Sequence, residues 1–434
     1  MKRRAAVFGL AAWAILPSVL SSVASAQDAA GSFGPHLKKG ARIALLGDSI
    51  TEQRLYSRNI AAYLAACHPD LEAHVFQFGW SGETAAGCNA RLENDVLPFK
   101  PDFATTCYGM NDGGYAPFNA GTGDRYKKPM MEIVRKLKEA GALVVVGSPG
   151  AVDRYFFRRG PDGEKTAAMY NDTLGKLRDI AKRTAKEYEF PFADVHQTMW
   201  CAATKAQNKL GKDYHVCGAD GFHPAPNGQL LMAHALLKGL GIGGDLGTIS
   251  IDMKGTATAT GGHQVESFAN GEATIVSRRF PFAPTGDAKS PGGTRSILPF
   301  IPFMENFSRL TLKVTNAPSE KLAVRWGNET KTFAKADLEK GINLAAEFDV
   351  TPLAPAYRKI DAAVGAQQEY QTYMIKSVIT HHRALKAQLG SDPEVAAATG
   401  TIEKKLWKRE ADLQAKVRAA IEPARHVLAI SPAP

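Results

Sequence analysis

Short apolar runs alternate with amphipathic stretches along the first half of the chain. Five mostly apolar runs predict buried strands at residues 43–46, 74–78, 103–107, 143–147 and 192–195. Between them, residues 130–140 and 167–188 place apolar side chains at helical spacing opposite Lys, Arg and Glu. Strands that alternate with such helices predict a three-layer α/β/α sandwich around a parallel sheet.

The pattern changes after Gly244, where short runs rich in Thr, Val and Ile are separated by Gly and Asn. It predicts a small all-β unit with strands at residues 248–253, 263–268, 273–280, 309–315 and 322–326, and a long surface loop at 283–294. From residue 356 the period becomes helical. Between residues 401 and 424 it gives one apolar stripe, which comprises Ile402, Leu406, Leu413, Val417 and Ile421. This stripe predicts a helix that packs on its own protein.

The first residues have the pattern of a signal peptide. Basic residues 2–4 precede an apolar stretch that Pro17 ends, and the small residues 24–26 before Gln27 fit a cleavage site. A transmembrane anchor is the alternative, but the apolar run is shorter than the roughly 20 residues that a span needs. We therefore expect a secreted or periplasmic protein with four parts: a signal peptide at 1–26, an α/β domain at 27–243, a β-rich unit at 244–350 and a helical segment at 351–434.

The composition is that of an ordered globular protein. The 434 residues are 44% hydrophobic and 22% charged, and at roughly 150 residues per unit they suggest two or three compact units. The formal charge of +10 falls to +7 without the signal peptide. Basic residues are scattered among acidic ones, apart from Lys404, Lys405, Lys408 and Arg409. This argues against nucleic acid as a partner and leaves an acidic polysaccharide open; no stable membrane insertion is expected after cleavage.

The chain has five cysteines, all of them after the signal peptide. Export permits oxidation, and Cys201 and Cys217 bracket the loop before Asp220, so we expect a disulfide between them. The remaining three are expected to be buried thiols: Cys67, Cys88 and Cys107. None has the spacing of a zinc site, and no metal is expected.

Four short motifs carry the candidate chemistry. Three follow predicted strands and the fourth precedes a helix that begins near Pro226: Gly47-Asp48-Ser49-Ile50, Trp80-Ser81-Gly82-Glu83-Thr84, Gly109-Met110-Asn111-Asp112 and Asp220-Gly221-Phe222-His223-Pro224. The carboxyl ends of parallel strands meet at one edge of a sheet, where such sheets bind ligands. We therefore expect the four motifs to form one acyl-transfer site.

Ser49 is the candidate nucleophile and His223 the candidate base. A serine hydroxyl attacks an ester only when an imidazole accepts its proton, and that imidazole needs a carboxylate that fixes its tautomer. Asp220, three residues before His223, can supply this carboxylate. Each residue also has a structural alternative, a helix cap for Ser49 and a backbone-bonded ring for His223. The rival bases are His196 and His215, and the rival acid is Asp194, which at a strand end more simply ties down a loop.

Gly82 and Asn111 are the candidate donors to the oxyanion. Negative charge develops on the ester carbonyl oxygen during acyl transfer, and preorganised N–H groups stabilise it. Gly82 can bring its backbone N–H close, Asn111 can offer its amide, and Ser49 can add its own N–H at the start of a helix. A turn glycine and a loop-capping amide are equally simple interpretations of the first two.

Together the four motifs resemble the blocks of the SGNH hydrolases, also called the GDSL esterase/lipase family, over roughly residues 42–240. The resemblance implies a flavodoxin-like sandwich with Ser49 as nucleophile, His223 as base and Asp220 as orienting acid. It also implies an oxyanion hole formed by Ser49, Gly82 and Asn111, and no cofactor. Ile50 and Gln77 depart from the usual leucine and asparagine of the family without touching a catalytic role.

These observations lead to the hypothesis of a secreted serine esterase that acts through an acyl-serine intermediate. An O-acetyl ester on a carbohydrate, small or polymeric, suits an exported chain with an added β unit. The alternatives are a lipid or aryl ester hydrolase, an O-acetyltransferase that uses the same residues, and a non-catalytic glycan-binding protein. Candidate residues for the wall of the substrate pocket are Arg54, Tyr108, Tyr115 and Phe118.

Overall fold

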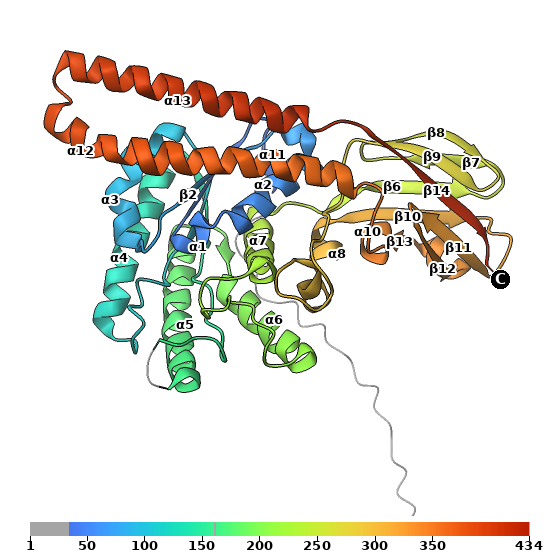
Figure 1. The fold of residues 1–434 in the computed structure, drawn as a ribbon, viewed down its shortest axis with the longest axis horizontal. Helices are drawn as coiled ribbons and strands as arrows, with labels where there is room; N and C mark the ends of the chain where they lie inside the picture. The colour runs from blue at the N-terminus through green and yellow to red at the C-terminus, as the bar shows by residue number, and fades with distance from the viewer. Residues whose placement is uncertain (1–33, 160–161, 434) are drawn as a thin grey trace, which may run out of the picture.

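The computed structural model describes residues 34–159 and 162–433, and its first part is the predicted parallel α/β sandwich (Figure 1). The strands are β1 Arg42–Gly47, β2 His74–Gly79, β3 Phe103–Cys107, β4 Leu143–Gly147 and β5 Phe192–Ala193, in the order β2-β1-β3-β4-β5. Strand β5 is shorter than predicted because Asp194 starts the next helix, where its carboxylate accepts a hydrogen bond from Gln197 N at 3.1 Å. The expected signal peptide lies outside the described residues.

Helices cover both faces of this sheet. One layer contains α2 Leu55–Cys67, α6 Val195–Leu210 and α7 Pro226–Leu240, and the other contains α3 Ala85–Asp95, α4 Ala120–Glu139 and α5 Gly163–Glu187. Helix α4 begins ten residues before the predicted start, where Asn119 accepts a hydrogen bond from Thr122 N at 2.9 Å. Its first turns bury Thr122, Gly123 and Tyr126, and only Tyr126 of these has a large side chain, so the apolar period does not reveal them.

Two further sheets form the β unit. The first has the order β13-β10-β6-β7 and the second β12-β11-β14-β9-β8. Five of these strands lie where they were predicted: β6 Asp245–Asp252, β8 His263–Ala269, β9 Glu272–Ser277, β10 Arg309–Thr315 and β11 Lys321–Trp326. Four were not predicted: β7 Thr256–Ala259, β12 Glu329–Ala334, β13 Ile342–Asn343 and β14 Ala424–Pro432.

The helical segment contains α11 Ala354–Thr372, a π-helical stretch η5 Tyr373–Ile379, α12 Thr380–Leu389 and α13 Pro393–Ala419. Helix α11 packs on α2, β2 and α13, while α12 and α13 extend together past α3 (Figure 1). The predicted stripe does pack on its own protein at Leu406, Leu413 and Val417, but Ile402 is 44% exposed. The segment is not helical to its end, because β14 returns to the β unit and pairs with β9 and β11.

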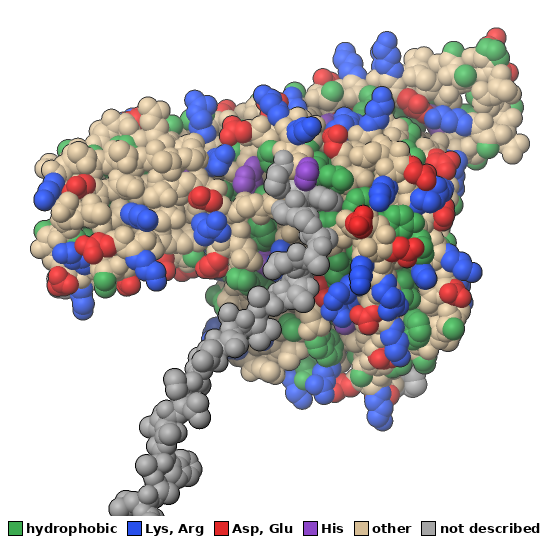
Figure 2. Space-filling model, turned by 180° about the vertical axis from the view of Figure 1, so that it is seen from behind, with side chains coloured by type: hydrophobic (Ala, Val, Ile, Leu, Met, Phe, Trp, Pro, Cys, Tyr) green, Lys and Arg blue, Asp and Glu red, His purple; other side chains and the backbone are tan. Residues whose placement is uncertain are grey.

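The surface and the cysteines bear on two other expectations. Lys and Arg side chains are spread among Asp and Glu on the face seen in Figure 2, without one dominant basic patch. Within the described ranges, no helix has the length and apolar content to cross a bilayer.

The expected disulfide is wrong, because Cys217 is buried while Cys201 is exposed on α6, where its sulfur accepts a hydrogen bond from Gln197 at 3.0 Å.

A buried chain of hydrogen bonds crosses the β unit. Trp326 Nε1 donates to His426 Nδ1 at 3.0 Å, so the proton of His426 lies on Nε2, which faces Ser277 Oγ at 2.8 Å. The Ser277 hydroxyl then donates to His263 Nδ1 at 2.7 Å, and His263 Nε2 donates to Leu246 O at 3.0 Å. Because each proton has one place in this chain, both imidazoles are neutral in the folded protein.

We expect this chain to make the protein sensitive to acid. Burial lowers the pKa of His263 and of His426 to about 4, whereas a histidine in the unfolded chain has a pKa of about 6.5. The unfolded chain therefore takes up protons first, and stability is lost as the pH falls from about 6.5 toward 4, by up to about 3 kcal/mol per histidine. Urea unfolding midpoints between pH 7.5 and pH 4.5 measure this loss. The variant His426→Gln should show a shallower pH dependence than the wild type, and an equal slope would contradict the assignment.

Candidate active site

The sheet register brings the first three motifs to one edge. In the parallel ladder Gly47 at the end of β1 pairs with Gly79 of β2 and with Cys107 of β3. Ser49, Gly82 and Asn111 follow these three strand ends by two to four residues. A hydrogen bond from Trp80 N to Gly47 O, at 3.1 Å, joins the first two loops just beyond the sheet.

Ser49 begins the single helical turn α1, Ser49–Glu52, directly after β1. The cap of this turn is Asp48, whose carboxylate accepts a hydrogen bond from Ile50 N at 3.0 Å, so Ser49 is not the capping residue. Its hydroxyl instead lies 2.8 Å from His223 Nε2. Ser49 and His223 are 174 residues apart in sequence and meet at the edge where the strands end.

Asp220 holds the ring of His223 from the other side. The distance from His223 Nδ1 to Asp220 Oδ2 is 2.7 Å, and Asp220 Oδ1 accepts hydrogen bonds from the N–H groups of Phe222 and His223 at 3.1 and 2.9 Å. Gly221 permits this tight turn, because it has φ of +84° and an added Cβ would lie 2.3 Å from Phe157 N. The geometry places a proton on Nδ1 and leaves Nε2 to accept one from Ser49.

The charge on Asp220 is stabilised by the same contacts. Partial burial raises the pKa of this carboxyl, but the hydrogen bonds from the His223 backbone, the His223 ring and the Phe222 backbone outweigh burial and lower the pKa overall. Asp220 is therefore ionised at neutral pH. An ionised carboxylate both fixes the imidazole tautomer and stabilises the imidazolium that would form when Ser49 gives up its proton.

The two candidate oxyanion donors occupy neighbouring loops. Gly82 has φ of +73°, and no atom lies within 4 Å of an added Cβ, so backbone conformation rather than space favours glycine there. Asn111 donates from Nδ2 to Glu83 O at 3.0 Å, and its Oδ1 accepts a hydrogen bond from Tyr115 at 3.1 Å. These bonds fix which way the amide points and tie the loop after β3 to the loop after β2.

Buried charged and polar groups hold the loop after β2 through Glu83. Arg91 binds the carboxylate of Glu83 at 2.6 and 2.7 Å, and Tyr108 donates to Glu83 at 2.9 Å. Burial raises the pKa of Asp48 to about 7 and that of Asp112 to about 6. Since both carboxyls take up protons close to neutral pH, they add less negative charge to this region than two fully ionised groups would.

The rival residues lie elsewhere or have other partners. Asp194 caps α6 and binds Arg178 Nε at 2.8 Å, which is the loop-fixing role expected for it. His196 is buried in the first turn of α6, and burial lowers its pKa to about 4. The ring of His215 packs on Phe156 at 5.2 Å between centroids. None of the three is hydrogen-bonded to Ser49 or His223 in the described part of the chain.

The candidate wall residues differ in their surroundings. Tyr108 is fully buried below the loops and cannot form a pocket wall, because its aromatic ring and hydroxyl are both enclosed. Tyr115 lies closer to the site, with its ring 5.6 Å from that of Phe222 and the guanidinium of Arg159 at 3.9 Å. Arg54 donates to Thr372 at 3.4 Å, and Phe118 is half-buried with Lys176 at 5.4 Å from its ring.

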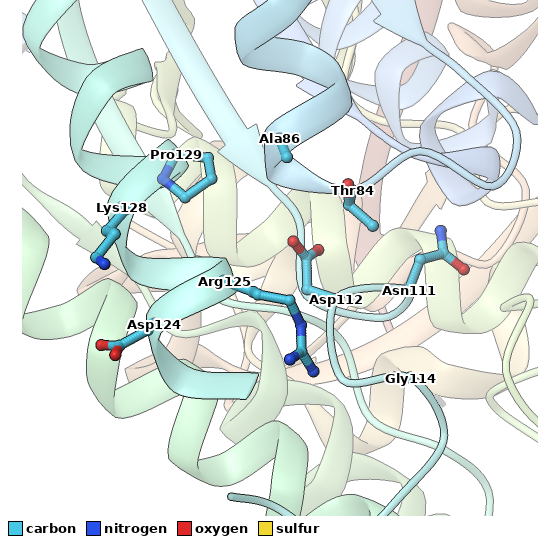
Figure 3. Close-up of a pocket in the computed structure, with 9 residues that line it drawn as sticks. All are labelled: Thr84, Ala86, Asn111, Asp112, Gly114, Asp124, Arg125, Lys128 and Pro129. Atoms are coloured by element: carbon cyan, nitrogen blue, oxygen red, sulfur yellow. The ribbon is translucent and has the colours of Figure 1, made fainter. Parts of the chain in front are cut away.

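A cavity of about 510 Å³ opens beside Asn111 (Figure 3). The loops after β2 and β3 and the first turns of α4 line it, and in the view Asp112 lies between Asn111 and Arg125, with its carboxylate pointing toward the loop that carries Thr84 and Ala86. Its wall also includes Thr84, Ala86, Gly114, Asp124, Lys128 and Pro129. Asp112 Oδ2 is buried and has no hydrogen-bond partner among the described residues. Arg125 and Lys128 bring hydrogen-bond donors to this lining. Over the described ranges, no group of three or more His, Cys, Asp or Glu residues could hold a metal ion.

Comparison with known proteins gives matches to the α/β domain and to the whole fold. Residues 45–231 match the model of the GDSL-like lipase/acylhydrolase family. An acetylxylan esterase of Geobacillus stearothermophilus is 23% identical over 226 residues, which are 46% of this chain and 94% of that protein.

Two solved structures illustrate the extent of the likeness. A gut microbial diltiazem-metabolizing enzyme aligns with a TM-score of 0.69 at 21% identity, covering 91% of this chain and 98% of that chain. An acetylxylan esterase structure from Geobacillus stearothermophilus has a TM-score of 0.39 at 23% identity, over 48% of this chain and 96% of that one. The first alignment shows that the fold recurs beyond the α/β domain, in the β unit and the helical segment as well.

Proposed function

Because residues 45–231 belong to the GDSL-like lipase/acylhydrolase family, the chain is an ester-hydrolysing serine hydrolase, and we propose that it works through an acyl-enzyme on Ser49. The observation that supports this proposal is the continuous chain of hydrogen bonds from Ser49 through His223 to Asp220, at 2.8 and 2.7 Å. Such a chain activates a hydroxyl that is otherwise a weak nucleophile.

In the first half of the reaction, Ser49 Oγ attacks the ester carbonyl carbon while His223 Nε2 accepts its proton. The carbonyl oxygen becomes an oxyanion, which the N–H groups of Ser49 and Gly82 and the amide of Asn111 stabilise. The tetrahedral intermediate then collapses, the bond to the alcohol oxygen breaks, and His223 returns the proton to that oxygen. The alcohol leaves and the acyl group stays on Ser49.

In the second half, a water molecule occupies the place of the departed alcohol. His223 removes a proton from this water as it attacks the acyl carbon, and the same donors stabilise the second oxyanion. When the intermediate collapses, the Ser49 oxygen leaves and takes the proton from His223. The products are a carboxylic acid and the free enzyme, and no cofactor takes part in either half.

We propose an O-acetyl ester of a carbohydrate as the substrate. An acetylxylan esterase aligns with this chain over 94% of its own length, which supports that choice. The cavity beside Asn111 adds the guanidinium of Arg125, which can donate hydrogen bonds to the hydroxyl groups of a carbohydrate. Export through the N-terminal signal peptide belongs to the same proposal, since acetylated polysaccharides lie outside the cell.

The substrate proposal predicts which esters are hydrolysed best. In a screen of p-nitrophenyl esters of rising chain length beside acetylated xylo-oligosaccharides, we expect the acetyl esters to give the highest kcat/KM. Arg125→Ala should raise KM for the acetylated glycan about tenfold, because a charged hydrogen bond to the glycan is lost. It should leave KM for p-nitrophenyl acetate unchanged. Lys127→Ala is the matched control, since Lys127 is exposed on the same helix and does not line the cavity.

Other outcomes of the screen separate the alternatives. A preference for long acyl chains, or an equal effect of Arg125→Ala on both substrates, would contradict a carbohydrate in this cavity. A transferase uses the same residues, so the products must be compared with and without a glycan acceptor. Transfer of the acetyl group to the glycan in place of hydrolysis would replace the esterase proposal.

A further inference from the structure

The helical segment, which lies outside the family match, reaches the proposed active site. Lys376 belongs to the π-helical stretch η5, and its Nζ lies 2.6 Å from Glu52 Oε1. Glu52 is the last residue of α1, three positions after Ser49. The two partners are 324 residues apart in sequence, so only the complete fold brings them together.

Glu52 also binds the loop after β2. Its second oxygen, Oε2, accepts hydrogen bonds from Ser81 N at 2.6 Å and from Ser81 Oγ at 2.5 Å. Ser81 directly precedes Gly82, the proposed oxyanion donor. Because both the backbone and the side chain of Ser81 are held by one carboxylate, the orientation of the next peptide group depends on where that carboxylate lies.

The contact is better shielded than the surface ion pairs of this protein. The side chains of Lys376 and Glu52 are 28% and 20% exposed, and Lys376 Nζ also lies 4.9 Å from the ring of Trp80. Partial burial raises the pKa of Glu52, but the hydrogen bonds from Lys376 and Ser81 outweigh burial and lower the pKa overall. Glu52 is therefore an ionised acceptor at neutral pH.

The chain just before Lys376 is anchored to the same part of the sheet. Gln77 N in β2 donates to Gln371 Oε1 at 3.3 Å, and Gln77 Nε2 donates to Thr372. Arg54 also donates to Thr372, at 3.4 Å. Gln77 is the residue that departs from the usual asparagine of the family, and its longer side chain here reaches α11. These hydrogen bonds fix the end of α11 on the sheet and thereby fix the backbone that leads to Lys376.

We propose that Lys376 is a positioning residue of this esterase. It orients Glu52, and Glu52 holds Ser81 so that the Gly82 N–H faces the developing oxyanion. This inference rests on the proposed function, since it assigns a role in oxyanion stabilisation. The helical segment would then contribute to catalysis, because the ammonium group of Lys376, which completes the relay of contacts through Glu52 to Ser81, lies outside the α/β domain.

The test replaces Lys376 in the full chain and measures hydrolysis of p-nitrophenyl acetate. Lys376→Met should lower kcat about tenfold with KM within about twofold, because a displaced donor weakens the transition state more than the bound substrate. Lys376→Arg should restore kcat to within about threefold of the wild type. Lys386→Met is the matched control, since Lys386 pairs with Glu403 on α13 at 2.5 Å, away from the site, and it should leave kcat unchanged.

Glu52→Gln provides a second, independent test. It should lower kcat as Lys376→Met does, and the double variant should lose no more than either single variant, because both changes break one relay. Additive losses would overturn the proposal, and so would a wild-type kcat in Lys376→Met or a loss that Lys376→Arg does not restore. If instead the wild-type protein hydrolyses no ester and a fluorophosphonate probe does not label Ser49, the proposed function itself is wrong.

Discussion

Ser49→Ala is expected to reduce ester hydrolysis by at least about 10⁴-fold while the protein stays folded. Ser49 Oγ is the atom proposed to form the bond to the acyl group, and alanine offers no substitute for it. The substitution removes one hydroxyl at the start of α1, whose cap is the Asp48 carboxylate, so little stability should be lost. Turnover of p-nitrophenyl acetate, circular dichroism and the melting temperature measure both halves of the prediction.

Covalent labelling separates this outcome from an indirect loss. A fluorophosphonate probe should modify the wild type at Ser49 and leave Ser49→Ala unmodified. Ser319→Ala, in the turn between β10 and β11, serves as the control and should be labelled and active like the wild type. An active Ser49→Ala variant would overturn the nucleophile assignment, and a folded wild type that the probe does not label would favour a binding protein.

The α/β domain could be predicted because its strands are buried on both faces. Strands β3 and β4 have the predicted bounds, since every residue between Phe103 and Cys107 and nearly every residue of β4 is apolar or buried. The ends of β1 and β3 then place the loops that carry Ser49 and Asn111. The sequence therefore predicts that the motifs of Ser49, Gly82 and Asn111 meet at one edge of the sheet.

Polar interiors explain what the sequence did not reveal. Helix α11 packs on its neighbours partly through glutamines: Gln371 donates to Val75 O of β2 at 3.0 Å, and both Gln367 and Gln371 donate to the buried Glu410 of α13, at 2.9 and 3.0 Å. Apolar spacing cannot predict such a contact, because these side chains are equally typical of a solvated surface. The short alternation around His426 and Leu428 in β14 was hidden in the same way by the helical pattern before it.

Contacts between single side chains far apart in the chain are also hard to predict from the sequence. Lys376 resembles the many exposed lysines of the segment until the fold places it beside Glu52. The expected disulfide failed for the corresponding reason, because spacing in the sequence says nothing of direction. Cys217 points into the interior, whereas Cys201 lies on the outer face of α6. Motifs near strand ends are therefore more predictable than partners that arrive from another part of the chain.

Asn111→Ala is expected to lower kcat by about 10²–10³-fold and to change KM by less than about threefold. The amide is proposed to bind the oxyanion, which exists in the transition state and not in the bound ester. Its loss should therefore raise the barrier without weakening substrate binding. Steady-state kinetics with p-nitrophenyl acetate and with an acetylated xylo-oligosaccharide separate the two constants, and both substrates should lose the same factor because they share the carbonyl oxygen.

The alternative role of Asn111 is to fix a loop, since it also donates to Glu83 O at 3.0 Å. Asn119→Ala is the matched control for that role, because Asn119 caps α4 by accepting a hydrogen bond from Thr122 N at 2.9 Å. Loss of such a cap should cost about 1 kcal/mol of stability and leave kcat unchanged. If Asn111→Ala behaves like Asn119→Ala, or if its effect is confined to KM, Asn111 has no place in the oxyanion hole; a large loss of kcat with an unaltered melting temperature assigns it there.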